Sequence, residues 1–478
     1  RYEMKKKIIA CLLASVLLFG IQGCGGKEPT AGEADRKLQE ASGGEAQEAQ
    51  SPESADSGEK IVLRYTGWGG PQEKKTTQNV IDQFEKTHPN VEVEYIHIPT
   101  DYNTKLTTMI AANQGPDVAL LNGDTALQWA SEGKLKNMMD FAADDPDINI
   151  EDILSQVVYW WDDGKACGVN GSLEIFGLFY NKDVFEEAGI TVPSTEEEAW
   201  TWEEFLDVCR TLTIDNQGRN AKDPDFDPKN IKQFGLFAPS GANMVSYAMA
   251  YCGQDFLNED GTAVNLLDTK GAEAMQNFAD LITRYHVAPS PVQSKNLPGG
   301  ATALASRKVA MVWDGQWALQ EISANKVNFG VGIPPKMYDK PMTIAMGEPV
   351  VVFETTQHPK EAWELQKAFM NTEYTMELIE TGLWMPVLRE WYEEEALIDR
   401  WARNNPAHPE GYVDAIMNNG FKNGEPALTY SIKNFPKIMD VLNPKLDKVW
   451  LGEMTVEEAI ASVEEQMNAQ VQGKYPRP

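Results

Sequence analysis

Tryptophan and carboxylate side chains that directly follow apolar runs are the first candidates for chemistry in this sequence. Trp68 follows the apolar run 61–65 and is flanked by glycines, which leave room for a ligand to approach. Asp124 follows a second such run, 117–121. An indole packs on the apolar face of a sugar-like ring, while carboxylates and amides pair with its hydroxyls. These residues indicate a site for a polyhydroxylated ligand; the competing interpretations are core packing for Trp68 and helix capping for Asp124.

The order of patterns in the chain predicts strands and helices in alternation. β-Branched or alternating runs predict strands, and apolar residues spaced three and four apart predict helices. The predicted strands are residues 61–65, 91–98, 117–121 and 176–180; the predicted helices are 76–88, 106–110, 127–135, 182–188, 202–212 and 272–285. This order predicts an α/β fold with largely parallel sheets, whose ligand sites lie at the carboxyl ends of the strands.

The first sixty residues have the pattern of a targeting signal followed by a linker rather than that of a folded core. Three lysines at 5–7 precede an apolar run, 8–21, that is shorter than the about 20 residues of a membrane-spanning helix. The order predicts a signal peptide over residues 1–23. Residues 25–60 are rich in Gly, Glu, Ala, Ser and Gln and have few large apolar side chains, so they are expected to form a flexible linker.

The composition excludes several function classes. The chain of 478 residues has 42 Lys and Arg against 72 Asp and Glu, a net charge of −30 that argues against nucleic acid as a partner. Its five histidines are far apart in sequence and no CxxC pair exists, so we expect no metal and no cofactor. No P-loop, HExxH or G-x-S-x-G pattern is present, so we expect no catalytic residues.

Five segments, in order, resemble the family of extracellular solute-binding proteins that feed ABC importers, particularly the branch similar to maltose-binding protein. The segments are Ile110-Ala-Ala-Asn-Gln-Gly-Pro-Asp-Val118, Leu178-Phe-Tyr-Asn-Lys-Asp-Val-Phe185, Pro193 with Thr201-Trp-Glu-Glu-Phe205, Val309-Ala-Met-Val-Trp-Asp-Gly-Gln-Trp317, and His358-Pro-Lys-Glu-Ala362. Cys24, after Ile21-Gln-Gly23, is similar to the lipidated cysteine of bacterial lipoproteins, with a plain signal peptide as the alternative.

The resemblance implies a two-lobed, periplasmic-binding-protein-like fold of type II with an interlobe hinge. We place lobe 1 at residues 61–173 plus 347–385, and lobe 2 at 174–346 plus 386–478. The implied protein is a monomeric lipoprotein, anchored through Cys24 on the extracellular or periplasmic face of the cell membrane. It would capture a sugar or oligosaccharide between the lobes and deliver it to the membrane permease.

The resemblance also implies further site residues in the second half of the chain. Trp317 matches the position of a sugar-stacking tryptophan, and Trp313 and Asp314 lie near it. Asn243 and Tyr247 occupy a segment that holds a carboxylate and a tyrosine in the branch, but the carboxylate is absent here. Trp384 lies where the family turns toward its cleft, and Asp124 matches an acceptor of sugar hydroxyls.

Two further features leave their alternatives open. Cys167, Cys209 and Cys252 permit one disulfide among them or buried free thiols. The run from Asp223 to Asp227, with Asp215 upstream, is rich in oxygen ligands, but a solvated turn is favoured over a calcium loop because EF-hand spacing is missing.

Two rival functions remain. The same importer role could serve a polyamine, a peptide or a polyol phosphate. A secreted carbohydrate-active enzyme would need paired carboxylates at a cleft, which 72 acidic residues do not exclude.

Overall fold

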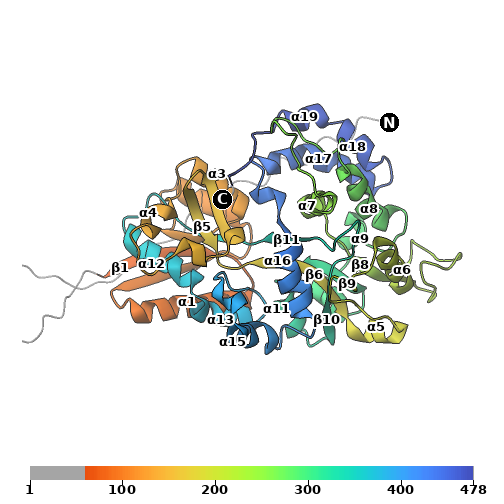
Figure 1. Ribbon diagram of the computed structural model, residues 1–478, viewed down its shortest axis with the longest axis horizontal. Helices are drawn as coiled ribbons and strands as arrows, with labels where there is room; N and C mark the ends of the chain where they lie inside the picture. The colour runs from red at the N-terminus through yellow and green to blue at the C-terminus, as the bar shows by residue number, and fades with distance from the viewer. Residues whose placement is uncertain (1–59, 477–478) are drawn as a thin grey trace, which may run out of the picture. The chain divides into compact units, whose positions relative to one another are not determined.

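A computed structural model describes residues 60–476 of the chain (Figure 1). The predicted signal peptide, Cys24 and the linker up to residue 59 therefore lie outside the described residues. Among the described residues, no helix has the length and apolar character to cross a bilayer.

The first of two sheets contains six strands in the order β2-β1-β3-β12-β5-β4. Strands β1, β2 and β3 are parallel, whereas β12 is antiparallel to β3 and β5, and β4 is antiparallel to β5. The bounds are β1 (Ile61–Gly67), β2 (Val91–His97), β3 (Val118–Leu120), β4 (Val158–Asp162), β5 (Lys165–Asn170) and β12 (Pro349–Val352).

The second sheet has the order β13-β11-β6-β9-β8-β7, with β10 also paired to β6. Parallel pairs are β8 with β9 and β11 with β13, while β6 is antiparallel to β9, β10 and β11. The bounds are β6 (Glu174–Asn181), β7 (Ile214–Asp215), β8 (Ile231–Phe237), β9 (Val309–Gly315), β10 (Phe329–Gly332), β11 (Thr343–Met346) and β13 (Gly424–Pro426).

The helices connect the strands of each sheet (Figure 1). Those between or after first-sheet strands are α1 (Pro71–Thr87), α2 (Tyr102–Ala111), α3 (Gly123–Ser131), α4 (Met138–Ala142), α12 (Pro359–Met370) and α13 (Thr372–Glu380). Those within the second-sheet segment are α5 (Lys182–Ala188), α6 (Trp202–Leu212), α7 (Gly241–Cys252), α8 (Gly271–Thr283), α9 (Pro291–Ser294), α10 (Gly300–Ala305) and α11 (Ala318–Ala324).

The C-terminal segment adds α14 (Glu390–Glu393), α15 (Glu395–Ile398), α16 (Asn419–Asn423), α17 (Phe435–Trp450), α18 (Val456–Ala461) and α19 (Glu464–Asn468). Helices α17 and α18 pack on α8 of the second lobe. The start of this segment instead contacts elements of the first lobe, because Arg389 N–H donates to the Asp152 carbonyl and Arg400 pairs with Glu373 of α13. The lobe boundary at residue 385 therefore stays a prediction.

Local sequence explains why the helices form where they do. α1 starts at a proline and buries Val80, Ile81 and Phe84 on one face, which packs toward β2, α12 and α13. α6 begins at a capping box, in which the Thr201 hydroxyl accepts from the Glu204 N–H and the Glu204 carboxylate accepts from the Thr201 N–H.

Three short segments cross between the sheets. Gly171–Leu173 joins β5 to β6, Gly347 and Glu348 join β11 to β12, and residues 381–388 follow α13. The crossings bond to one another, since Met385 N–H donates to Ser172 Oγ at 3.0 Å and Gly171 N–H to the Glu348 carbonyl at 3.2 Å. They form one connected junction.

The α/β fold class is confirmed, and the predicted strands and helices recur within a few residues of their observed bounds; α5 and α6 match theirs. The expectation of largely parallel sheets is wrong. The chain passes between lobes more than once, and each crossing strand enters its sheet against the direction of its neighbours, so β12, β5 and β6 form antiparallel pairs.

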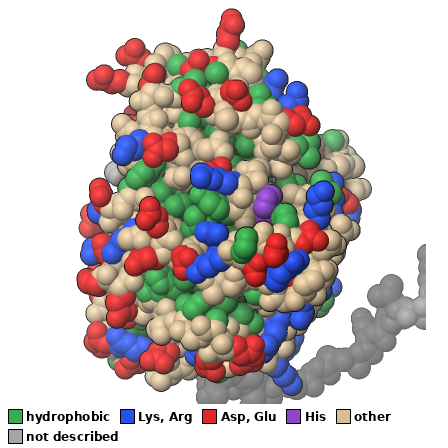
Figure 2. Space-filling view, turned by 90° about the vertical axis from the view of Figure 1, so that its right-hand side faces the viewer, with side chains coloured by type: hydrophobic (Ala, Val, Ile, Leu, Met, Phe, Trp, Pro, Cys, Tyr) green, Lys and Arg blue, Asp and Glu red, His purple; other side chains and the backbone are tan. Residues whose placement is uncertain are grey.

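The side of the molecule that carries α5 and α6 is a mixed, charged surface. Figure 2 shows Asp and Glu side chains spread over this face among Lys and Arg, with hydrophobic side chains in between. The acidic charge on this face is therefore dispersed in contact with water.

Candidate functional site

A cavity of about 330 Å³ lies where both sheets and their crossings meet. Its lining comes mainly from three kinds of place: the ends of β1, β3 and β9, the first turns of α1 and α7, and the three crossings. The lining residues are Trp68, Glu73, Leu120, Asn122, Ser172, Glu174, Asn243, Trp317, Met346, Glu348, Leu383 and Trp384. The cavity thus lies at carboxyl ends of strands, where α/β folds place their ligands.

Three tryptophans from separate parts of the chain face this cavity. Trp68 directly follows β1 and Trp317 follows β9, so the first and second sheets each contribute one ring. Trp384 comes from the crossing after α13 and is 5% exposed. The cavity therefore offers indole surface from both lobes and from the junction.

Glycines allow two of these rings to approach the backbone. A Cβ at Gly315 would lie 2.0 Å from the Trp317 ring, and a Cβ at Gly171 would lie 2.4 Å from the Trp384 ring. Trp317 also meets Phe176 of β6 edge to face, with ring centroids 5.1 Å apart. Packing of this kind fixes the ring planes before any ligand arrives.

Three glutamates line the same cavity. Glu73 is in the first turn of α1, Glu174 is the first residue of β6, and Glu348 lies in the crossing from β11 to β12. Glu348 accepts hydrogen bonds from the Gly123 N–H at 2.7 Å and from the Tyr430 hydroxyl at 3.4 Å. No Lys, Arg or His is among the lining residues, and none of residues 60–476 forms an ion pair with these glutamates.

Burial raises the pKa of all three carboxyls, because removal from water disfavours the charged form. It raises the pKa of Glu73 to about 7 and, with repulsion from Glu73 and Asp314, that of Glu174 to about 8. The pKa of Glu348 is raised well above its usual range by burial and by Glu174, against the lowering effect of the Gly123 hydrogen bond.

The structure brings together four of the residues selected from the sequence. Trp68, Asn243, Trp317 and Trp384 all line the cavity. Asp124 lies in the first turn of α3, two residues after the lining residue Asn122, and its carboxylate accepts from the Thr125 N–H at 2.7 Å.

Three selected residues, Trp313, Tyr247 and Asp314, do not line the cavity, which corrects their prediction as site residues. Trp313 and Tyr247 are 2% and 0% exposed, and the Trp313 indole N–H donates to the Tyr247 hydroxyl at 2.8 Å. Both rings pack against Phe278 of α8, so they belong to the second-lobe core rather than to the cavity wall. Asp314, beside them, is half-buried and accepts from the Gly315 N–H; it does not line the cavity either.

The sequence reasoning missed Glu73, Asn122, Ser172, Glu174 and Glu348. The last three lie in or beside the crossings, where a polar residue interrupts an apolar run. A polar residue within an apolar run is a signal in the sequence that could have marked these positions as site candidates. Only the fold, however, brings Glu174 and Glu348 to the same cavity.

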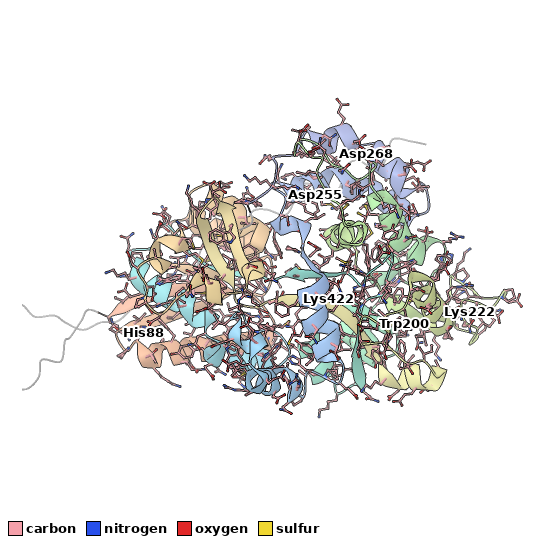
Figure 3. All side chains as sticks on the ribbon, viewed as in Figure 1. His88, Trp200, Lys222, Asp255, Asp268 and Lys422 are labelled. Carbon is pink, nitrogen blue, oxygen red and sulfur yellow. The ribbon has the colours of Figure 1, made fainter. Side chains whose placement is uncertain are left out.

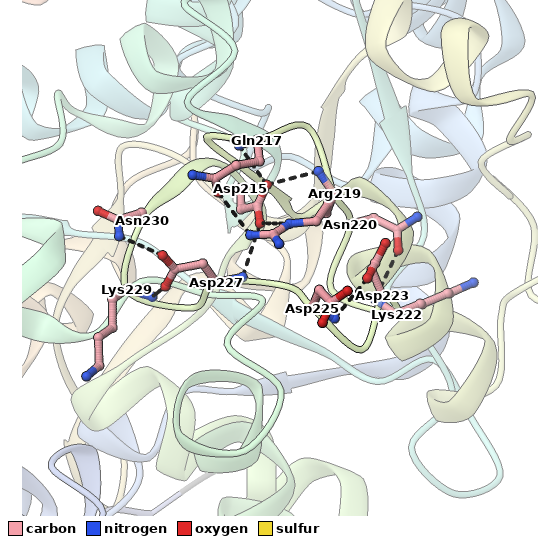
Figure 4. A network of polar contacts seen from close by, with 10 residues as sticks. All are labelled: Asp215, Gln217, Arg219, Asn220, Lys222, Asp223, Asp225, Asp227, Lys229 and Asn230. Atoms are coloured by element: carbon pink, nitrogen blue, oxygen red, sulfur yellow. Dashed lines mark hydrogen bonds and ion pairs between the residues drawn. The ribbon is translucent and has the colours of Figure 1, made fainter.

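The aspartate-rich loop is held by its own hydrogen bonds (Figure 4). The fully buried Asp215 carboxylate accepts from the backbone N–H groups of Gln217, Arg219 and Asp227 and pairs with the Arg219 guanidinium at 2.7 Å. Within residues 60–476, no group of acidic, His or Cys side chains is arranged to hold a metal ion. The favoured interpretation of this loop as a turn agrees with its geometry.

Cys167, Cys209 and Cys252 are all free thiols. Cys167 and Cys209 are buried, and burial raises the pKa of the Cys167 thiol to about 12. Of the two open interpretations, the structure has unpaired cysteines.

A larger hollow, of about 900 Å³, lies beside the first sheet and is less suited to a cargo. It includes His88, which Figure 3 shows among the first-lobe helices, far from the second-lobe loop that carries Lys222. Its Lys367 is already neutralised by Asp145 at 2.7 Å and by Glu364 at 3.0 Å. No strand or helix of the second sheet's segment, residues 174–346, contributes to its lining, so this hollow does not lie between the two sheets.

The fold and the cavity define the class: a two-lobed α/β protein with a polar, aromatic cavity at the junction of its lobes. Residues 68–376 match the family of bacterial extracellular solute-binding proteins, and the chain belongs to that family.

Two curated relatives and two solved structures illustrate the similarity. A putative binding protein of Brucella abortus is 25% identical over 362 residues, covering 73% of this chain and 80% of the relative. The multiple sugar-binding protein of Streptococcus mutans is 24% identical over 353 residues, covering 67% of this chain and 73% of the relative.

The structural matches share the fold. An ABC substrate-binding protein of Listeria monocytogenes, solved in complex with cycloalternan, matches with a TM-score of 0.70 and 24% identity, covering 86% of this chain and 98% of that chain. The maltose/maltodextrin-binding domain MalE of Bdellovibrio bacteriovorus, bound to maltotriose, matches with a TM-score of 0.66 and 18% identity, covering 86% and 99%.

Proposed function

We propose that this protein is the substrate-binding component of an ABC importer and captures a sugar or oligosaccharide in the cavity between its lobes. The observation that carries the proposal is the set of three indoles, Trp68, Trp317 and Trp384, around one cavity with amide and carboxyl groups between them. Indole faces suit the apolar faces of pyranose rings, and the polar groups suit their hydroxyls. Relatives named as sugar-binding proteins support the same cargo class.

Capture would proceed by closure of the lobes about the crossings. On this proposal lobe 1 is residues 61–173 plus 347–385, and lobe 2 is 174–346 plus the C-terminal segment. A ligand resting on Trp68 and Trp384 would be completed by Trp317 from lobe 2. Because the cage is complete only when closed, binding energy shifts the open–closed equilibrium.

Membership of the family also suggests how the protein is anchored and how it reaches its permease. We infer lipidation of Cys24, anchoring on the outer face of the cell membrane, a linker that lets the lobes reach the permease, and a monomeric body. The linker, at about 5 to 6 Å times the square root of its length, would hold the body some 30 Å from the surface.

An enzyme is the less favoured alternative. A glycoside hydrolase needs one protonated and one ionised carboxyl in its cleft. Here burial raises the pKa of all three cavity glutamates, and no Lys, Arg or His lines the cavity to favour the ionised form of one of them. Incubation with oligosaccharides should therefore release no new reducing ends.

Calorimetric titration of the full chain with mono- and oligosaccharides tests the proposal. We expect saturable, one-to-one binding of one saccharide series and a thermal stabilisation that grows with ligand concentration. Binding of peptides or polyol phosphates with no response to any saccharide would reject the sugar assignment while leaving the family intact.

A further inference from the structure

The cavity combines three carboxyls with no positive charge. Saccharide hydroxyls are neutral, so a neutral sugar brings no counter-charge to Glu73, Glu174 and Glu348. Burial of a charged group costs free energy unless an opposite charge or sufficient hydrogen bonds accompany it. Ionisation of these carboxyls therefore calls for a positive charge that the cavity lining does not supply.

The hydrogen-bond partners of the three carboxyls support this interpretation. Glu348 accepts hydrogen bonds from Gly123 N–H, Tyr430 Oη and the Asn122 side chain. The carboxyls of Glu174 and Glu73 receive no hydrogen bond or ion pair from residues 60–476. The neighbouring basic side chain, His97, is held by the Gly69 carbonyl at 2.9 Å instead.

The aromatic lining adds a second, independent attraction for positive charge. A cation over an indole face is stabilised by the negative potential of the ring, most strongly by tryptophan. Trp68, Trp317 and Trp384 line the same cavity as the carboxyls. Indole faces and unpaired carboxyls together favour an ammonium group on a ring that also has an apolar face.

We propose that the cargo is an amino-bearing saccharide, whose ammonium group is the counter-ion of Glu73, Glu174 and Glu348. This rests on the proposed function, because it names the substrate class of the same cavity. Apolar ring faces would pack on the indoles, remaining hydroxyls would reach Asn122, Asn243 and Ser172, and the ammonium group would lie among the carboxyls.

The ionisation of the three cavity carboxyls determines how the affinity for an ammonium ligand depends on pH. The titratable groups that interact with the three glutamates are Asp314 on β9, Asp124 on α3, and the hydroxyls of Tyr430, Tyr65 and Tyr95, none of them cationic. Below pH 7 the carboxyls of Glu73 and Glu174, with pKa values of about 7 and 8, are mostly protonated. An ammonium ligand favours their ionised form, so its affinity rises from pH 5.5 to pH 7.5, whereas a neutral sugar gains nothing.

The test compares matched pairs of ligands that differ only by an ammonium in place of a hydroxyl. Calorimetry on the full chain would use glucose and glucosamine, galactose and galactosamine, and the 1,4-linked disaccharides of each, with spermidine as a non-saccharide cation. We expect at least tenfold tighter binding of the amino member in one pair at pH 7.5, and a smaller preference at pH 5.5.

Variants locate the effect. Glu174→Gln should reduce the preference at least tenfold, because it weakens binding of the amino member far more than binding of the neutral member; Glu73→Gln serves the same purpose if Glu174→Gln does not fold. The control is Glu453→Gln, which removes an exposed carboxylate outside the cavity and should leave the preference unchanged.

The outcomes separate the two proposals. Equal or tighter binding of the neutral member in the pairs that bind overturns the amino-saccharide proposal and leaves the sugar-binding function standing. Binding of spermidine with no saccharide response overturns both, since the cargo is then not a saccharide. A preference that survives Glu174→Gln and Glu73→Gln also overturns the role assigned to the carboxyls.

Discussion

Replacement of Trp317 by alanine is the sharpest single test of the cavity as the cargo site. The indole is half-buried, lies against Gly315 and meets Phe176 edge to face. A sugar face covering roughly 60 Å² of this ring, at about 25 cal/mol per Å², gives about 1.5 kcal/mol. Because about 1.4 kcal/mol corresponds to tenfold in affinity, Trp317→Ala should weaken binding about tenfold.

The matched control is Trp200→Ala. Trp200, labelled in Figure 3, is also a half-buried indole of the second lobe and lies just before α6, outside the cavity lining. Both variants should unfold at lower temperatures than the parent chain because each loses packing. Calorimetry at 25 °C with a ligand identified for the parent should show weakening only for Trp317→Ala.

Two results would refute this reasoning. Unchanged affinity in a folded Trp317→Ala protein would remove the ring from the site. Equal weakening by Trp200→Ala would mean that the loss reflects second-lobe stability rather than contact with the ligand.

The remaining predictions concern stability and the cavity lining. Asp215→Asn should lower the melting temperature by several degrees, and more than Asp223→Asn, because Asp215 is buried and paired with Arg219 whereas Asp223 is exposed. Backbone and Arg219 hydrogen bonds lower the pKa of Asp215 to about 2, against the effect of burial. The difference in melting temperature between the parent chain and Asp215→Asn should therefore vanish as the pH falls from 4 toward 2. Calcium or EDTA should leave the melting temperature of the parent chain unchanged. The ligand-free protein should lose stability as the pH rises from 5 to 8. The raised pKa of Glu174 keeps a proton bound in the native state that the unfolded chain has already released. Thermal unfolding of Glu174→Gln should therefore show a smaller loss of stability over the same pH range. Gly171→Ala should displace Trp384 and weaken cargo binding with a modest change in melting temperature; undiminished affinity would contradict the close packing of that ring.

The sequence predicted residues whose signal is local. Trp68 was found because a strand end, two glycines and an aromatic ring are adjacent in the chain, and the helices α5 and α6 were found because their apolar spacing is regular. These features depend on backbone periodicity and turn chemistry alone.

The errors arose where tertiary packing decides. β9 is covered on its two faces, so alternation could not say whether Trp313 or Asp314 meets the cleft; in the structure neither does, since Trp313 is held in the core by Tyr247 and Phe278. Glu174 and Glu348 lie far apart in sequence and converge because two crossings run side by side, which no local pattern records.

The crossings that join the lobes also line the cavity, and this combination constrains how the protein can be re-engineered. Ser172, Glu174, Glu348 and Trp384 are both the pivot of closure on our proposal and the surface on which a ligand rests. Substitution there to alter cargo preference would also shift the resting balance between open and closed forms, and with it the signal that the permease reads. Trp68 and Trp317 line the cavity outside the crossings, so they are the positions where a biosensor designer could retune selectivity without resetting the hinge.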